Sequence, residues 1–301
     1  MAQNTDDPLA QLSAALAGRT AAARPLVAAI RMRGHSLRSG ALWRQDVVVA
    51  SEQTLPRVGD AEVALADGGS FAARVVGRDP GTNIVVLRFD AGPQPAWSPA
   101  AAPQSGALAL ALAADGAGDV ATRLGVVHSV GPAWHSRAGG RIDRRIRLDI
   151  WLGRGEEGGP VIDAAGGVLG ISTLGPRRQV LVIPTATIER VIEPLLTTGR
   201  IPRGWLGAAV QPVEVPEPLR DEAGHTQGLM VVGLTADGPA AQAGVLMGDI
   251  LVTLDGAAVG GVSRLAELLG PEAVGKQLQL RLIRAGSALS LGVTVGERPT
   301  R

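Results

Sequence analysis

The sequence predicts a mainly β protein with about two domains, and three observations support this prediction. The chain has 301 residues, enough for about two domains at the usual size of roughly 100–200 residues each. It is 46% hydrophobic, which is sufficient for a core, and its 41 glycines interrupt the chain often. Short apolar runs bounded by Gly or Pro recur along the chain, whereas helical stretches are few, which favours ordered β-structure over disorder.

The N-terminal segment, residues 1–25, is expected to be helical. Asp7 and Pro8 form a helix start, and the apolar residues that follow them have helical spacing. We expect this helix to end near Gly18, with a further helical turn that stops before Pro25.

Short strands are expected to follow in a first β unit. They span residues 26–32, 36–43, 47–51, 61–65, 71–79 and 84–89. The stretch 90–105 is rich in Pro and Ala and has little periodicity, so we interpret it as a connection to a second β unit.

The second β unit is expected to be closed by a helix. Its strands span residues 107–112, 123–130, 141–149, 160–163, 168–173 and 179–184. Many short strands at this spacing indicate barrels or a sandwich. Thr185 caps a helix over 186–198 that ends at Gly199, so the first domain extends over 26–199. The apolar face of this helix comprises Ile188, Val191, Ile192 and Leu195.

A smaller domain is expected over residues 205–298. Pro202 and Gly204 mark the preceding linker, 200–204. The strands of this domain span 206–210, 229–234, 250–254, 277–284 and 289–295, and one helix spans 263–269. The polar and acidic stretch 214–227 is expected to be a mobile loop.

Composition limits the classes of function. The formal net charge of +1 gives no general attraction to nucleic acid or to anionic membranes. The absence of cysteine excludes disulfides, a thiol nucleophile and thiolate metal sites. No basic segment leads into an apolar core at the N-terminus, and no later stretch approaches 18 uninterrupted apolar residues. As numbered, the chain is expected to be cytoplasmic and without a membrane span; a misassigned start codon would make it periplasmic.

A glycine-dense turn lies between two apolar runs and carries two adjacent carboxylates. Gly155, Gly158 and Gly159 allow positive φ or close approach of another backbone, as a turn that presents chemistry requires. Glu156 and Glu157 could indicate acid–base chemistry or a metal site. Consecutive residues in a turn usually point apart, and no His or Asp cluster accompanies them, so we favour a loop that has lost its chemistry and expect no cofactor or metal.

Several motifs together resemble the HtrA/DegP family, in which a chymotrypsin-like serine protease domain of two β-barrels precedes a PDZ domain. They are the junction Val182-Ile183-Pro184 through Gly199-Arg200-Ile201-Pro202-Arg203-Gly204-Trp205-Leu206-Gly207, and the stretches Gly238-Pro239-Ala240-Ala241-Gln242-Ala243-Gly244-Val245, Gly248-Asp249-Ile250-Leu251 and Asp255-Gly256. The resemblance covers nearly the whole chain. It implies a mainly β fold, with the PDZ domain as a small barrel or sandwich with flanking helices.

The resemblance also identifies the positions of the family's catalytic triad, and none has the expected residue. The Ser position of the turn is Glu157, the Asp position in the stretch 79–87 is Asn83, and the His position after Val49 is Gln53. Such a protease needs a Ser whose proton is taken by a His that an Asp orients, and glutamine has no basic nitrogen. The resemblance therefore implies a pseudoprotease without catalytic residues. Gly155 and Glu156 would belong to the former oxyanion turn, and the Glu157 carboxylate would fill the oxyanion hole.

Peptide binding is the activity that the resemblance leaves to the PDZ domain, which would add a peptide C-terminus as an extra strand. The implied binding residues are Trp205, Leu206, Gly207 and Ala208 of the carboxylate loop, Ala209 and Val210 of the strand edge, and Leu265, Leu268 and Leu269 of the helix. A PDZ domain that serves only as a rigid spacer remains the alternative.

Three functions stay open at this point. The first is an inactive scaffold or adaptor in protein quality control that binds peptide or protein C-termini; the second is a hydrolase with residual or altered activity; the third is a chaperone-like holdase. Homo-oligomers are compatible with the sequence, but no aromatic residue precedes Trp43, so the aromatic trimer contacts of the family are not carried over. The arginines at 137, 141, 144, 145 and 147 are interpreted as a solvated hairpin, with an anion-binding patch or a contact to the acidic stretch 214–222 as alternatives.

Overall fold

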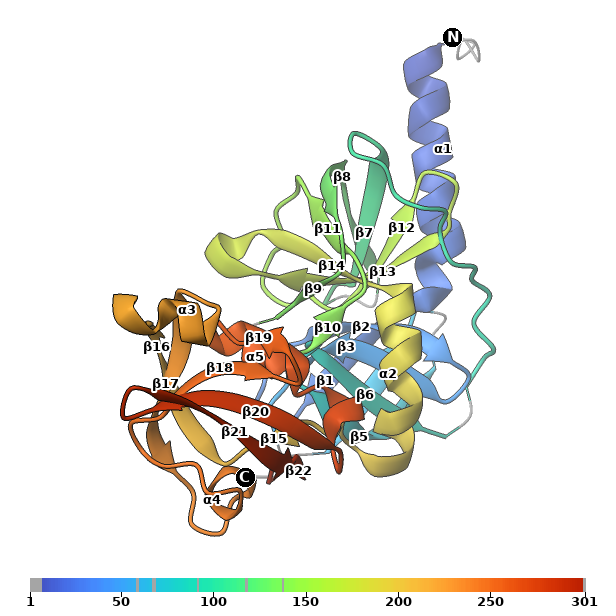
Figure 1. Cartoon of the computed structure of the whole chain (residues 1–301). Helices are drawn as coiled ribbons and strands as arrows, with labels where there is room; N and C mark the ends of the chain where they lie inside the picture. Colours follow the sequence, from blue (N-terminus) through green and yellow to red (C-terminus); the bar gives the residue numbers. More distant parts are fainter. Residues whose placement is uncertain are drawn as a thin grey trace, which may run out of the picture. The chain divides into compact units, whose positions relative to one another are not determined.

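A computed structural model of the protein describes residues 7–57, 60–66, 69–90, 92–116, 119–136 and 138–299 (Figure 1). The chain forms two compact units. The first runs to Trp134 and resumes over Arg141–Arg200; the second comprises His135–Gly140 and the chain from Ile201 onward.

Helix α1 (Pro8–Ala23) opens the first unit. The Asp7 side chain accepts a hydrogen bond from the Leu9 N–H at 3.1 Å, and Pro8 occupies the first turn, where its missing N–H is not needed. The helix continues past Gly18, where it was expected to end, because one glycine costs a helix only about 1 kcal/mol and the alanines at 21–23 extend it. A 3₁₀ turn, η1 (Arg24–Leu26), leads into the first strand.

A closed, six-stranded antiparallel barrel follows, with the strand order β1-β2-β3-β6-β5-β4. Its strands are β1 (Val27–Met32), β2 (Arg38–Arg44), β3 (Val47–Ser51), β4 (Ala61–Leu65), β5 (Ser70–Asp79) and β6 (Ile84–Phe89), and the short helix η2 (Glu52–Thr54) follows β3. All five residues of β3 are buried, so this strand lies at the centre of the unit.

A second closed, six-stranded antiparallel barrel has the order β11-β14-β13-β12-β7-β8. Its strands are β7 (Leu108–Ala114), β8 (Val120–Gly131), β11 (Arg145–Leu148), β12 (Pro160–Asp163), β13 (Val168–Leu174) and β14 (Val180–Pro184), with η3 (Pro176–Arg178) before β14. The strand expected over 141–149 is divided into β10 (Arg141–Ile142) and β11, and β9 (Trp134–His135) is a further two-residue strand.

Helix α2 (Thr185–Thr198) closes the first unit. Its four predicted apolar residues are buried, and Gly199 ends it in the left-handed conformation, with its N–H bonded to the Leu195 carbonyl at 3.1 Å. The helix backbone lies directly on β5, since a Cβ added at Gly77 would stand 2.4 Å from the Leu195 oxygen. The glycine is therefore required for this close approach.

The second unit is built on one sheet with the strand path β16-β17-β18-β20-β21, so β16 and β21 are its edges. Its strands are β15 (Gly204–Trp205), β16 (Ala208–Glu214), β17 (Gln227–Leu234), β18 (Ile250–Leu254), β19 (Ala257–Ala258), β20 (Gln277–Arg284), β21 (Ser287–Thr294) and β22 (Gly296–Glu297). Its helices are η4 (Glu217–Leu219), α3 (Arg220–Ala223), α4 (Pro239–Gln242), α5 (Val262–Leu268) and η5 (Pro271–Ala273).

The stretch 214–227, expected to be a loop, contains η4 and α3 instead. Val215 is fully buried and Ala223 is 2% exposed, and both pack in a small cluster with Val252 and Ile283. The loop was predicted because most residues of this stretch are polar, and the pattern did not show that Val215 and Ala223 would be buried.

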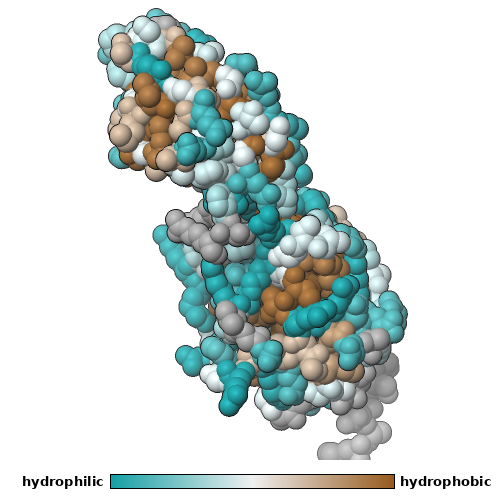
Figure 2. All heavy atoms as spheres, turned by 90° about the horizontal axis from the view of Figure 1, so that it is seen from below, coloured by the Kyte–Doolittle hydropathy of each residue, from teal (hydrophilic) through white to brown (hydrophobic). Residues whose placement is uncertain are grey.

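The predicted fold class is confirmed: the protein is mainly β, with two six-stranded antiparallel barrels followed by a smaller sheet. Within the described part of the chain, no helix has the length and apolar character needed to cross a membrane. Figure 2 shows one face of the molecule, on which hydrophobic side chains gather in patches bordered by hydrophilic ones.

Candidate functional site

The three positions that the sequence singled out meet in the first unit. Pairing of β3 with β6 sets Ser51 opposite Ile84, which brings the turn after β3 next to Asn83. The Gln53 N–H donates to Asn83 Oδ1 at 2.9 Å, and Gln53 Nε2 donates to Glu157 Oε1. Asn83 has φ 59°, a left-handed conformation that asparagine tolerates better than most residues. Residues that lie far apart in the sequence thus share one hydrogen-bonded cluster.

Glu157 is the centre of this cluster and is only 6% exposed. Besides Gln53, its Oε1 atom accepts from Ser51 Oγ at 2.7 Å, Thr173 Oγ1 at 2.8 Å and the Leu174 N–H at 3.1 Å. A buried carboxylate is costly unless hydrogen bonds replace its hydration, and these donors do so.

The direction of the Glu157 side chain corrects one expectation. Its carboxylate was expected to fill the oxyanion hole of its own turn, but its donors belong to β3, η2 and β13 and to the residue that ends β13. The Glu156 N–H bonds instead to the Gly153 carbonyl at 3.4 Å. The carboxylate therefore occupies the space between the two barrels' strand ends, where hydroxyl and amide donors surround it.

Sequence reasoning missed Ser51 and Thr173, two hydroxyl residues of the cluster. Asn83 Nδ2 donates to Ser51 Oγ at 2.9 Å and to Thr173 Oγ1 at 2.6 Å. Ser51 ends the apolar strand β3, and Thr173 follows Ser172 in the otherwise apolar strand β13, and this is the only signal that the sequence offered. Ser51 is fully buried, so a substrate carbonyl has no approach to its Oγ atom.

No basic side chain hydrogen-bonds to this cluster among the described residues. The partners are amides, hydroxyls, one carboxylate and backbone groups. The cluster can hold a structure together, but it contains no imidazole or amine, and its one carboxylate is buried among hydrogen-bond donors.

The glycine framework of the turn is packed tightly against neighbouring strands. Gly155 and Gly158 have φ 88° and 100°, and a Cβ on Gly158 would stand 2.4 Å from the Ser39 carbonyl oxygen. A Cβ on Gly159 would stand 1.9 Å from the Leu112 carbonyl oxygen. The Ser39 N–H and Oγ both donate to the Gly155 carbonyl, at 2.9 and 2.8 Å. Packing alone therefore requires these glycines.

Glu156 points away from Glu157 and binds Arg123. The guanidinium donates to both carboxylate oxygens, at 2.7 and 3.0 Å, and the Gly153 N–H donates to one of them at 2.8 Å. Burial opposes ionisation of Glu156, but the hydrogen bonds from Arg123 and Gly153 hold the pKa of its carboxyl below the usual value. Arg123 also lies over the Trp151 ring, 5.1 Å from its centroid.

The second unit contains the loop predicted to capture a peptide carboxylate. Gly207 has φ 74°, and its carbonyl accepts from the Thr235 N–H at 2.7 Å, while the Leu206 carbonyl accepts from the Ala240 N–H at 2.7 Å. The N–H groups of Leu206 and Gly207 donate no backbone hydrogen bond to another described residue. Consecutive free N–H groups at such a turn form a nest that suits an anion.

Strand β16, which follows this loop, is an edge strand. Its ladder partner is β17, so its other edge is available within the described sheet. Ala208 and Val210 are partly buried on the core, Ala209 is exposed, and Leu265 and Leu269 of the α5 region belong to the core, at 7% and 8% exposed. Trp205 pairs with Gly296 in β15 and β22.

Leu268 is partly buried and packs against the core that includes Leu206, Leu265 and Leu269. It lines a pocket with residues of β18, β19 and β20 to which no residue of 205–210 contributes.

The predicted basic patch is largely solvated or paired locally. Arg144 and Arg145 are exposed. The Asp143 carboxylate forms ion pairs with Arg190 at 3.0 Å and with Arg141 at 3.6 Å. Arg137 lies outside the described residues. No anion-binding arrangement is formed by these contacts.

Two family models match the chain, one in each unit. Residues 38–171 match the trypsin-like peptidase domain, and residues 204–295 match the PDZ domain.

Among curated proteins, the chain is similar to proteins called "Probable periplasmic serine endoprotease DegP-like". One from Brucella suis is 29% identical over 280 residues, covering 87% of this chain and 52% of the relative. One from Halomonas elongata is 29% identical over 278 residues, covering 88% of this chain and 57% of the relative. The chain thus spans about half the length of the curated relatives it matches.

Solved structures share the fold over nearly the whole chain. The HtrA-type protease AlgW with tripeptide superposes with a TM-score of 0.74 at 27% identity and covers 95% of this chain and 98% of its own. The serine endoprotease from Yersinia pestis superposes with a TM-score of 0.76 at 24% identity and covers 93% of this chain and 97% of its own.

Proposed function

Because the chain is an HtrA/DegP-like, trypsin-fold protein with a C-terminal PDZ domain, we propose that it is a catalytically inactive scaffold that binds peptide or protein C-termini. Its PDZ domain would present these ligands in protein quality control, and its barrels would serve as a rigid body without protease activity.

The observation that carries the inactive state is the composition of the cluster around Glu157. Acyl transfer of the trypsin type needs a nucleophile whose proton passes to a base. Gln53 is not basic, Glu157 accepts hydrogen bonds where a nucleophile would stand, and Asn83 bonds to hydroxyls and to a backbone N–H. Loss of a whole triad removes all but a residual acceleration, on the order of 10³–10⁴-fold over water, in proteases of this mechanism.

Peptide binding is supported by the geometry of the second unit. The two free N–H groups of Leu206 and Gly207 lie directly before the open edge strand β16. A peptide added along this edge would pair its backbone with β16 and place its terminal carboxylate at the nest. The solved structure of a similar protein, the HtrA-type protease AlgW, is one with a tripeptide.

Casein turnover by two forms of the protein tests the proposed inactivity. The native chain is expected to show no turnover, whereas the triple variant Gln53→His, Asn83→Asp and Glu157→Ser is expected to gain some, because the glycine framework of the turn is intact. Turnover by the native chain above a buffer blank would contradict the proposal. If the triple variant also showed no casein turnover, the proposal would be judged on the turnover of the native chain alone.

A further inference from the structure

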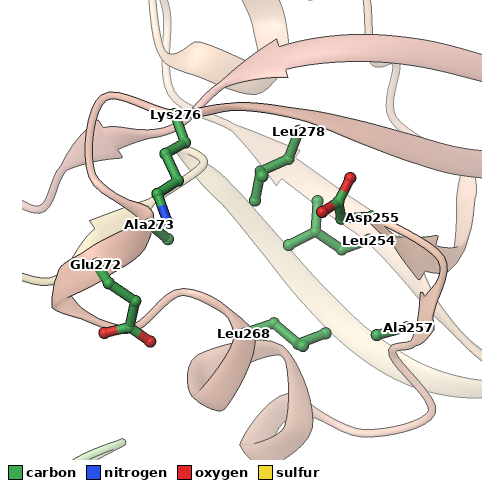
Figure 3. A pocket seen from close by; sticks show the side chains of 8 residues that line it. All are labelled: Leu254, Asp255, Ala257, Leu268, Glu272, Ala273, Lys276 and Leu278. Atoms are coloured by element: carbon green, nitrogen blue, oxygen red, sulfur yellow. The ribbon is translucent and has the colours of Figure 1, made fainter.

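A pocket of about 220 Å³ lies in the second unit, and of the predicted peptide-binding residues Leu268 alone lines it. Its apolar lining includes Leu254 at the end of β18, Leu268 of α5 and Leu278 of β20. Figure 3 shows the side chains of Leu268 and Leu278 on facing sides of a common opening, with Leu254 beside them. Unlike most core side chains, Leu268 and Leu278 are only partly buried, so the pocket is open to an apolar group from outside.

The volume of the pocket suits one side chain. Sites for small organic ligands usually measure roughly 300–1,000 Å³. A cavity of about 220 Å³ is smaller than this range, although it exceeds the space of a few water molecules, at roughly 30 Å³ each. A leucine-sized side chain with its flanking backbone matches it better than a whole cofactor.

Three charged side chains form the rim of the pocket: Asp255, Glu272 and Lys276. Figure 3 shows Glu272 and Lys276 on one side of the opening and Asp255 on the opposite side. None of the three forms an ion pair with another described residue. Two carboxylates and one ammonium give the rim a formal charge of −1, with one carboxylate on each side of the apolar lining.

We propose that this pocket is a second peptide-binding site, which takes an internal segment of a protein partner with the pattern basic–apolar–basic. The apolar side chain would enter between the three leucines, and the flanking basic side chains would meet Asp255 and Glu272. Because such a segment needs no free C-terminus, the site would operate independently of the carboxylate loop at Leu206 and Gly207. Lys276 would limit the affinity by repelling the basic side chain on its side.

The chain provides its own reporter for this site, since Lys276 is the only lysine among 301 residues. Reductive methylation with ¹³C-formaldehyde would label this side chain and the α-amino group, and methylation keeps the positive charge. The Lys276 resonance then reports on the pocket, and the α-amino resonance is the internal reference.

The probe is the blocked peptide acetyl-Gly-Arg-Leu-Arg-Gly-amide, titrated into the labelled full chain. We expect a saturable shift of the Lys276 resonance with a dissociation constant below about 1 mM, in the range of weak peptide sites. Replacing the central leucine of the peptide by alanine should weaken binding about tenfold, because most of the buried apolar surface is lost. The peptide with glutamates in place of both arginines should not saturate. The amide end excludes carboxylate capture, so failure of this test is separate from failure of the proposed function.

A charge-reversing variant tests the rim without changing the fold. Asp255→Asn with Glu272→Gln changes the formal rim charge from −1 to +1 and should weaken the probe at least about tenfold. Asparagine tolerates the left-handed conformation of Asp255, which has φ 50°, so the turn should form as before. Leu278→Arg should also abolish binding, and Leu246→Arg is its matched control, because Leu246 is 53% exposed outside the pocket.

Three results would overturn the proposal. They are the absence of a saturable shift up to several millimolar probe, equal binding of the leucine and alanine peptides, and tighter binding of the acidic peptide than of the basic one. Undiminished binding to the Asp255→Asn, Glu272→Gln variant would likewise show that the probe binds elsewhere.

Discussion

At the scale of single residues, the two adjacent glutamates of the turn have different environments. Glu157 accepts hydrogen bonds from two hydroxyls, an amide and a backbone N–H, whereas Glu156 binds an arginine and the Gly153 N–H. We expected the two side chains to point apart, because consecutive residues in a turn usually do. The partners of Glu157 could not be predicted, because they come from β3, η2 and β13, whose relative placement depends on the closure of both barrels.

The Glu156–Arg123 pair predicts a pH dependence of stability. The hydrogen bonds from Arg123 and Gly153 lower the pKa of Glu156 below its ordinary value despite the burial of the carboxyl, so its ionised form stabilises the fold. This contribution is complete above the unfolded-state pKa and is lost as the pH falls through the lower folded-state pKa. Arg123→Met should therefore lower the thermal midpoint at pH 7 and leave it nearly unchanged near pH 2, as measured by circular dichroism.

A matched control for this variant is Arg24→Met. Arg24 pairs with Asp119 at 3.1 Å, but both side chains are well exposed, at 46% and 67%, so little change is expected at either pH. An equal loss of stability for Arg123→Met at both ends of the pH range would show that lost packing on Trp151, and not the ion pair, is responsible.

At the scale of elements, strand positions followed from short apolar runs and their Gly and Pro boundaries. The sequence pattern failed where tertiary packing decided. The alanines after Gly18 extended α1, the strand over 141–149 was divided, and the stretch 214–227 folded around Val215 and Ala223. These three differences between the predicted and the observed elements have one physical origin. The local composition does not show which residues will pack against distant parts of the chain.

Two glycine substitutions separate local propensity from packing. Gly77→Ala should destabilise the protein by about 1–3 kcal/mol, because its Cβ would stand 2.4 Å from the Leu195 carbonyl and force α2 away from β5. Gly18→Ala in α1 has no atom within 4 Å of its added Cβ and should stabilise the helix by up to about 1 kcal/mol. Urea unfolding of both variants measures these changes. A neutral Gly77→Ala variant would contradict the close packing of α2.

At the scale of the whole molecule, the two units divide the proposed function. The barrels contain the turn glycines that packing requires, and Gln53, Asn83 and Glu157 share one polar cluster in which Glu157 is buried and Gln53 is exposed. Within the described part of the chain, the sheet of the second unit has β16 as an edge strand, and the Leu206 and Gly207 N–H groups before it donate to no other backbone group. The fold and the meeting of Gln53, Asn83 and Glu157 could be anticipated from motifs, whereas the pocket around Lys276 could not, because its residues are scattered over five elements.

One calorimetric titration tests the proposed scaffold most directly. A decapeptide with a free C-terminal carboxylate and apolar last residues is titrated into the native chain, and the peptide is then recovered for mass spectrometry. We expect saturable binding, loss of binding when the same peptide is amidated, and recovery of the peptide at its original mass. Cleaved peptide, or equal binding of the free and amidated forms, would contradict the account.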